Sequence, residues 1–134
     1  MVQKNRIIKS IGEDRLKILG KDKEELFEII NNFRPDIISL EEIPEYFMDD
    51  NITKKLYDSN RTYSIFETTH DSSFPVENKR WFPDKFIFVS AFNAFRYSMY
   101  DIPYEIVEYP IDKKEQNKIS NVRFKRYIDK KTDK

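Results

Sequence analysis

Glycine is nearly absent from this chain, and its scarcity limits the sites that the chain can build. Only Gly12 and Gly20 occur, so no glycine follows residue 20. Phosphate-binding loops, the dinucleotide-binding GxGxxG turn and the GxSxG nucleophile elbow all use glycines, because they need a positive φ or a close backbone approach. The sequence therefore excludes these three kinds of site.

Length and composition indicate one domain, residues 1–134, with a core that needs no cross-links. Cysteine is absent, which excludes disulfides, thiolate metal sites and a cysteine nucleophile. The start of the chain is charged where a signal peptide is apolar, and no apolar run has the length of a membrane span. We therefore expect a cytoplasmic protein with no membrane partner. Residues 128–134 are expected to form a frayed tail.

Acidic and basic residues balance over the whole chain but not along it. Residues 31–59 contain three basic and seven acidic residues, whereas residues 112–134 contain nine basic and four acidic ones. The two regions either attract each other and remain solvated, or form one anionic and one cationic docking face.

The acids at 41–50 lack the spacing of a calcium loop, and a helix would spread them over more than one face, so no metal site is expected.

Turn residues and apolar periodicity predict the elements of the first half. Residues 6–11 and 15–19 are predicted as a hairpin around Gly12, with a helix over 6–19 as the alternative. An apolar stripe behind an Asp22 cap predicts a helix over 22–33. One or two short helices are expected within 39–60, with Pro44 near a start and Asp50 or Asn51 as a cap. A strand over 62–69 and a loop over 70–83 follow.

The stretch from Trp81 to Tyr109 holds ten of the twenty aromatic residues. Phe88, Phe92, Phe95 and Met99 recur at helical spacing, which predicts a helix over 84–100 with this stripe in the core. The alternative is a strand at KFIFV, residues 85–89, because that segment is apolar on both faces.

Residues 104–109 and 121–128 alternate as strands and are expected to pair across a polar loop. The predicted fold is therefore a single compact α+β domain. Its N-terminal hairpin and helices precede a small antiparallel sheet packed on the aromatic helix.

Few residues have the pattern of a catalytic site. His70 is the only histidine, and no sequence context supports a Ser-His-Asp triad, so a solvated loop position is expected. Asp36 with Glu77 and Lys79 imitates the spaced Pro-Asp…Glu-x-Lys pattern of restriction-like nucleases, whose acids hold a metal ion on adjacent strands. Because Glu77 falls in a predicted loop, we predict no catalytic residue.

Two segments are candidates for binding a partner. Arg80, Trp81 and Phe82 are residue types enriched at binding hot spots, with Arg96 and Tyr97 as possible neighbours, unless Trp81 and Phe82 close one end of the core. A second segment interleaves basic and aromatic side chains on a terminal strand, which is typical of phosphate binding or of a guarded sheet edge; its residues are Arg123, Lys125 and Tyr127.

The sequence is thus most typical of a non-catalytic protein that binds another macromolecule without a cofactor. Inhibitors, immunity or antitoxin-type proteins and phage-encoded host-blocking proteins belong to this class. A nucleic-acid or nucleotide-phosphate binder using the basic C-terminal strand is the alternative, and a metal-dependent nuclease is the third hypothesis. Self-association is compatible with each hypothesis.

Overall fold

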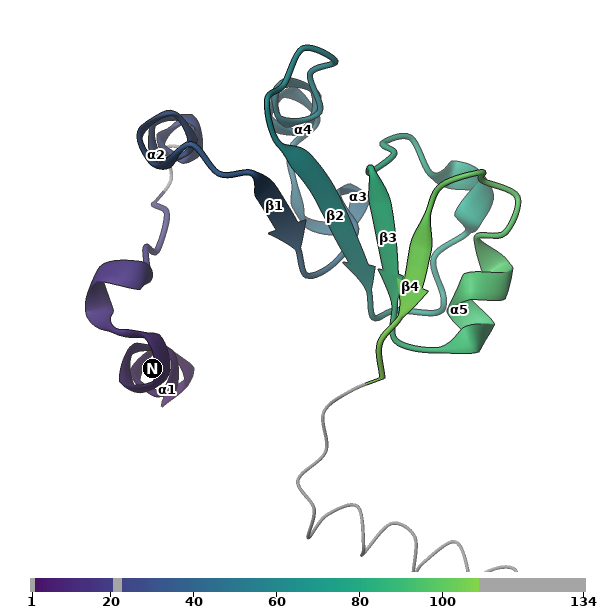
Figure 1. The fold of residues 1–134 in the computed structure, drawn as a ribbon, viewed down its shortest axis with the longest axis horizontal. Coiled ribbons are helices and arrows are strands. Elements are labelled where there is room, and N and C mark those ends of the chain that lie inside the picture. Colours follow the sequence, from purple (N-terminus) through teal and green to yellow (C-terminus); the bar gives the residue numbers. More distant parts are fainter. Residues whose placement is uncertain (1, 21–22, 109–134) are drawn as a thin grey trace, which may run out of the picture.

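The computed structural model describes residues 2–20 and 23–108, and its centre is a four-stranded sheet in the order β1-β2-β3-β4. The strands are β1 (Ile37–Leu40), β2 (Ser64–Thr69), β3 (Lys85–Phe88) and β4 (Tyr104–Ile106). Every neighbouring pair is parallel, and the four arrowheads in Figure 1 point the same way. The predicted antiparallel sheet is therefore wrong, and the fold is α/β.

Each connection carries the chain from the end of one strand back to the side of the sheet where that strand began. The next strand therefore runs in the same direction. The helices α3 (Pro44–Phe47) and α4 (Asp50–Leu56) lie between β1 and β2, and the 3-10 turn η2 (Val76–Asn78) lies between β2 and β3. The helix α5 (Ala91–Arg96) connects β3 to β4. In Figure 1, α3 and α4 lie behind β1 and β2, and α5 lies beside β4.

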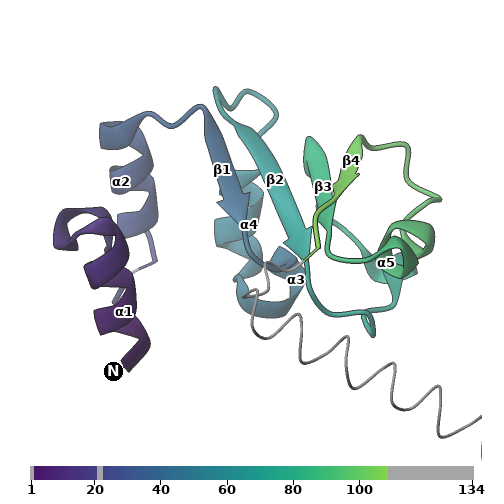
Figure 2. The same cartoon turned by 60° about the horizontal axis from the view of Figure 1, so that its bottom comes forward.

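The predicted N-terminal hairpin is also wrong, because this region is helical. α1 (Val2–Ile11) is followed by the 3-10 turn η1 (Glu13–Arg15) and by α2 (Glu25–Phe33). Gly12 has a φ of 95°, a conformation that glycine adopts without strain, and it ends α1. Both helices lie to one side of β1 (Figure 2). The predicted helix over 22–33 is confirmed as α2, and the predicted cap Asp22 lies outside the described residues.

The single helix predicted over 84–100 is wrong as well. The alternative strand at residues 85–89 is present as β3, and a separate short helix follows it. Ser90 has extended backbone angles and caps α5 by accepting the N–H of Asn93 at 3.2 Å. Because α5 begins only after this break, Phe88 does not lie on the same helix as the residues of α5. A helical periodicity that includes Phe88 therefore predicts the wrong buried face of α5.

As a result, α5 buries the face opposite to the predicted stripe. Phe92 and Phe95 in α5, and Met99 in the turn after it, are 61%, 76% and 62% exposed, and we call these three residues the outer face of α5. The buried face consists of Asn93, Ala94 and Tyr97. The prediction that the stripe fills the core was therefore wrong for these three residues.

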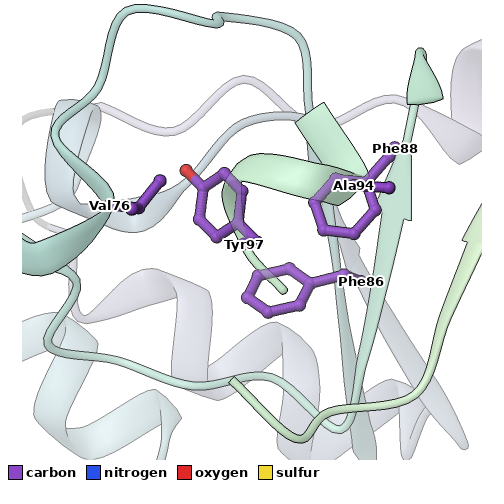
Figure 3. Packing of buried hydrophobic residues seen from close by; sticks show 5 residues of the cluster. All are labelled: Val76, Phe86, Phe88, Ala94 and Tyr97. Atoms are coloured by element: carbon purple, nitrogen blue, oxygen red, sulfur yellow. The ribbon is translucent and has the colours of Figure 1, made fainter. Parts of the chain in front are cut away.

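A core cluster is formed where α5 and η2 pack on β3. Figure 3 shows the ring of Tyr97 between Val76 and the rings of Phe86 and Phe88. The ring centroid of Tyr97 lies 5.2 Å from that of Phe86 and 5.4 Å from that of Phe88. Because Phe86 and Phe88 alternate along β3, both point to the face that α5 covers.

The predicted strand over 104–109 is present, in shorter form, as β4, whereas the predicted strand over 121–128 lies outside the described residues. In the part of the chain that the structure describes, no helix has the length and apolar character required to cross a membrane.

Candidate functional site

The parallel sheet brings three loops to one edge, which we call the carboxyl edge. The loop after β1 begins at Glu41, the loop after β2 at His70 and the loop after β3 at Val89. In open parallel sheets, ligands bind outside the carboxyl ends of the strands, because loops from several strands can place polar groups there. This edge is therefore where the topology predicts a site.

Glu42 fastens the first two loops together. Its Oε2 accepts the backbone N–H groups of His70 and Asp71, both at 3.2 Å, and its Oε1 accepts that of Ile43 at 3.0 Å. Three donors that would otherwise lack partners are thus bound by one carboxylate. The loop after β2 is therefore fixed to the end of β1.

The fixed loop presents polar side chains to solvent. His70 Nε2 lies 3.4 Å from Glu41 Oε2, and the two side chains are 33% and 74% exposed. Asp71 Oδ1 accepts the Ser73 hydroxyl at 2.6 Å and the Ser73 N–H at 2.7 Å. The hydrogen bonds from Ser73 lower the pKa of Asp71, so this carboxylate is ionised at neutral pH.

The third loop is tied to the same region through α5. The guanidinium of Arg96 donates to the backbone oxygen of Phe74 and, at 3.4 Å, to Asn93 Oδ1. Asn93 is itself buried, and its N–H is held by Ser90. Carboxylate, imidazole and hydroxyl groups from neighbouring strand ends are thus held in place around one open edge.

A second group of polar side chains surrounds Glu67 of β2 and is buried. We call it the acid–lysine cluster, and it consists of Glu45, Tyr57, Glu67 and Lys79. Lys79 Nζ lies 2.8 Å from Glu67 Oε1 and 2.8 Å from Glu45 Oε1. The phenol of Tyr57 donates to Glu67 Oε2 at 2.6 Å. The side chains of Glu67 and Lys79 are fully buried, and that of Glu45 is 4% exposed.

This burial bears on the nuclease hypothesis. On that third hypothesis Lys79 would act beside Glu77 at an open metal site, but its ammonium is enclosed by Glu45 and Glu67. Glu77 lies in η2 and Asp36 precedes β1, so neither acid lies on a strand. Within residues 2–20 and 23–108, no three acids or histidines are placed to hold a metal ion.

The acids at 41–50 have separate structural roles and form no common face. Asp49 caps α4 by accepting the N–H groups of Asn51 and Ile52 at 2.8 and 3.4 Å. Asp50 forms a bidentate ion pair with Arg80 at 3.0 and 2.9 Å. The other acids of the segment, Glu41, Glu42 and Glu45, belong to the carboxyl edge or to the acid–lysine cluster.

The predicted partner-binding residues fall into two environments. Arg80 is exposed beside Asp50, and Phe82 is 41% exposed with its ring centroid 4.9 Å from that of Tyr100. Trp81 is half-buried, and Glu45 Oε1 accepts the N–H groups of Arg80 and Trp81, both at 3.1 Å. Arg96 is held by the backbone oxygen of Phe74, and Tyr97 is 2% exposed, so Tyr97 belongs to the core rather than to the surface.

The alternative phosphate-binding residues, Arg123, Lys125 and Tyr127, lie outside the described residues. Sequence reasoning missed the pairing of Glu41 and Glu42 with the His70 loop, because no strand was predicted at Ile37–Leu40 and residues 39–60 were predicted to form short helices. A signal for the acid–lysine cluster was present: Glu67 interrupts the apolar and β-branched run SIFETT, and such an ionisable residue inside a strand requires a buried partner.

Comparison with protein-family models, with curated proteins and with solved structures finds no match to this chain.

Proposed function

We propose that the protein binds a small polar molecule at the carboxyl edge of its sheet. The observation that carries this proposal is the fastening of the His70 loop to the end of β1 by Glu42, which leaves His70, Glu41 and Asp71 fixed at an open edge. Pre-ordered polar groups bind a ligand more tightly than mobile ones, because less conformational freedom is lost on binding. We also propose that the protein acts in the cytoplasm, because a chain without cysteine is compatible with a reducing compartment.

The groups at this edge favour a ligand that carries hydrogen-bond donors. Glu41 and Asp71 supply carboxylate acceptors, and the guanidinium of Arg96 is engaged by Phe74 and Asn93. A carboxylate repels phosphate and binds hydroxyl or ammonium groups. We therefore propose a hydroxyl- or amine-bearing ligand in preference to a nucleotide phosphate.

The single histidine gives a direct test. In a ¹³C-resolved NMR spectrum, the imidazole Cε1–H group gives one resonance, because His70 is the only histidine. We expect that resonance and the backbone amide of Asp71 to shift, in a saturable manner, with a member of a polyol and amine library. Inorganic phosphate is not expected to shift them. A library without any saturable shift at these two positions would contradict the proposal.

A matched pair of variants separates the site from general surface effects. Asp71→Asn removes a charge from the carboxyl edge, whereas Asp101→Asn removes one from the exposed loop before β4. Binding should weaken by about tenfold or more in Asp71→Asn, in line with a lost charge-assisted hydrogen bond. Equal weakening in both variants would show that the effect of the charge is nonspecific.

A second candidate function is macromolecular binding, and the outer face of α5 favours it. Phe92, Phe95 and Met99 are exposed on one side of α5, while Tyr97 and Ala94 are buried on the other. A helix that is apolar on both sides is usually covered on both sides. Inhibitors and antitoxin-type proteins contact their partners through exposed apolar faces of this kind.

The test for this second function compares two exposed aromatic residues. Phe95→Ser, on the outer face of α5, should abolish capture of a partner from the native host, whereas Phe33→Ser, at the end of α2, should leave capture unchanged. The two side chains have similar exposure, 76% and 79%, so both variants should fold. Loss of capture in both variants, or in neither, would contradict a contact through α5.

A further inference from the structure

The acid–lysine cluster contains one more carboxylate than cation. The ammonium of Lys79 lies between the carboxylates of Glu45 and Glu67, and none of the three side chains is more than 4% exposed. An uncompensated charge in a site without water is strongly unfavourable. A proton bound to one of the two carboxylates makes the cluster neutral.

The hydrogen bonds indicate which carboxylate holds the proton. Glu45 accepts from Lys79 Nζ at both of its oxygens and from the N–H groups of Arg80 and Trp81, so four donor contacts stabilise its charged form. Glu67 accepts one hydrogen bond, from Tyr57. Its Oε1 forms an ion pair with Lys79 Nζ at 2.8 Å, so Glu67 has fewer donor contacts than Glu45.

The contact between Glu67 and Tyr57 is suited to both protonation states. When Glu67 is ionised, the phenol donates to Oε2; when Glu67 is protonated, the carboxyl O–H donates to the phenol oxygen at the same separation of 2.6 Å. For the proton to bind, only the phenol hydrogen has to turn away from Oε2, and the ring and the carboxyl group keep their places. In the neutral form, Oε1 remains as a carbonyl oxygen beside the ammonium.

We infer that the acid–lysine cluster is a buried proton-binding site centred on Glu67, and that release of this proton loosens the segment Lys79–Trp81 that leads into β3. This segment is held by Glu45, which shares Lys79 with Glu67. When Glu67 becomes ionised, it competes with Glu45 for the same ammonium, and the cluster gains a buried negative charge. The inference is independent of ligand binding at the carboxyl edge.

The surroundings of Glu67 favour a proton at neutral pH. Burial raises the pKa of Glu67 from its ordinary value of 4.5 to about 7, against the opposing effect of Lys79. Tyr57, from the end of α4, and Tyr97, from α5, both have a raised pKa because of burial and stay neutral. Glu45 from α3 and Lys79 are the charged groups that act on Glu67.

The sign of the effect follows from linkage. The folded protein holds a proton on Glu67 between pH 4.5 and about 7, where the unfolded chain has released it. This proton stabilises the fold at acidic pH, and its stabilisation is lost as the pH rises through about 7. The unfolding equilibrium constant should rise by at most about tenfold per pH unit over this window.

Trp81 reports on the proposed motion. It is the only tryptophan, its backbone N–H donates to Glu45, and its ring centroid lies 5.9 Å from that of Tyr57. We expect the tryptophan fluorescence of the folded protein to change between about pH 6 and pH 8, with an apparent midpoint near 7. Glu67→Gln, which imitates the protonated acid, should remove this transition, and urea unfolding should then depend less on pH between 4.5 and about 7.

Two further variants keep the inference testable. His70→Gln removes the only imidazole of the chain and should leave the transition in place. Tyr57→Phe removes the phenol, whose charge-assisted hydrogen bond to ionised Glu67 is stronger than its bond to the neutral acid and lowers the pKa of Glu67, so the midpoint should move to higher pH. A transition that survives in Glu67→Gln, or disappears in His70→Gln, overturns the inference. If Glu67→Gln does not fold, the direction of the Tyr57→Phe shift decides: an unchanged or lower midpoint also overturns it.

Discussion

The carboxylate of Glu42, at the end of β1, accepts the backbone N–H of His70, at the end of β2, at 3.2 Å. This contact joins two strand ends that are 28 residues apart in the chain. The ordered conformation of the loops at the carboxyl edge therefore depends on the side chain of Glu42. A mutation can remove this side chain without changing the core.

Glu42→Ala should therefore destabilise the protein by about 1–3 kcal/mol, the cost of leaving partly buried donors without an acceptor. Amide hydrogen exchange should accelerate at Ile43, His70 and Asp71, whose N–H groups bind Glu42. Glu41→Ala is the matched control, because its side chain is exposed, and it should leave the exchange of these amides unchanged. Similar exchange in the two variants would show that Glu42 does not fix the loop.

The aromatic residues near the end of the described chain give a second prediction. Tyr97→Ala removes a ring that is packed against Phe86 and Phe88 and should cost about 3–5 kcal/mol in urea unfolding. Phe95→Ala should cost less than about 1 kcal/mol, because its side chain is 76% exposed. The reverse ranking would mean that α5 packs with its other face on the sheet.

Tyr97 also carries a hydroxyl that is buried and has no hydrogen-bond partner among the described residues. Tyr97→Phe removes this unsatisfied group and keeps the ring, so the variant should be as stable as the parent or more stable. Thermal unfolding measures this directly. A loss of more than about 1 kcal/mol would show that the hydroxyl is satisfied in solution.

Parts of this fold were predictable from local sequence patterns. The strand β2 was expected because β-branched and aromatic residues gather in it, β4 because apolar and polar residues alternate, and α2 because its apolar residues recur at helical spacing. Short helices were also expected within residues 39–60, where α3 and α4 lie. The parallel arrangement was not expected. The six residues of α5 were merged with β3 into one predicted helix, so no crossover was predicted after β3.

The candidate sites were less predictable than the fold, because they depend on which strands are neighbours. Glu42 and His70 share no local pattern, and they meet only because β1 and β2 are parallel and adjacent. In the same way, Glu45 and Lys79 are 34 residues apart, and only the packing of α3 against the segment before β3 brings them together. The predicted elements placed Glu42 and Glu45 in the segment of short helices, and His70 and Lys79 in the loop over 70–83, without bringing either pair into contact.

The start of α4 provides a prediction about local structure. Asp49→Ala removes the cap of α4 and should destabilise the protein by about 0.5–2 kcal/mol, because the N–H groups of Asn51 and Ile52 lose their acceptor. Asp50→Ala is the neighbouring control. It removes only an exposed ion pair with Arg80, and its effect on chemical denaturation should be smaller. A larger effect of Asp50→Ala would show that this ion pair, and not the cap, holds the start of the helix.

The last prediction concerns the segment from Arg80 to Phe82, which was expected from its composition to contact a partner. Trp81 is half-buried against Tyr57, and its indole nitrogen is enclosed without a hydrogen-bond partner among the described residues. Below about pH 6, where Glu67 holds its proton, the tryptophan emission of the folded protein should be blue-shifted and poorly quenched by iodide. Arg80→Ala should leave this emission unchanged, because the Arg80 side chain lies outside with Asp50, whereas Tyr57→Ala should shift it to the red. A red-shifted emission that iodide quenches fully in the parent protein would show that the indole is exposed to water. Trp81 would then be available for contact with a partner.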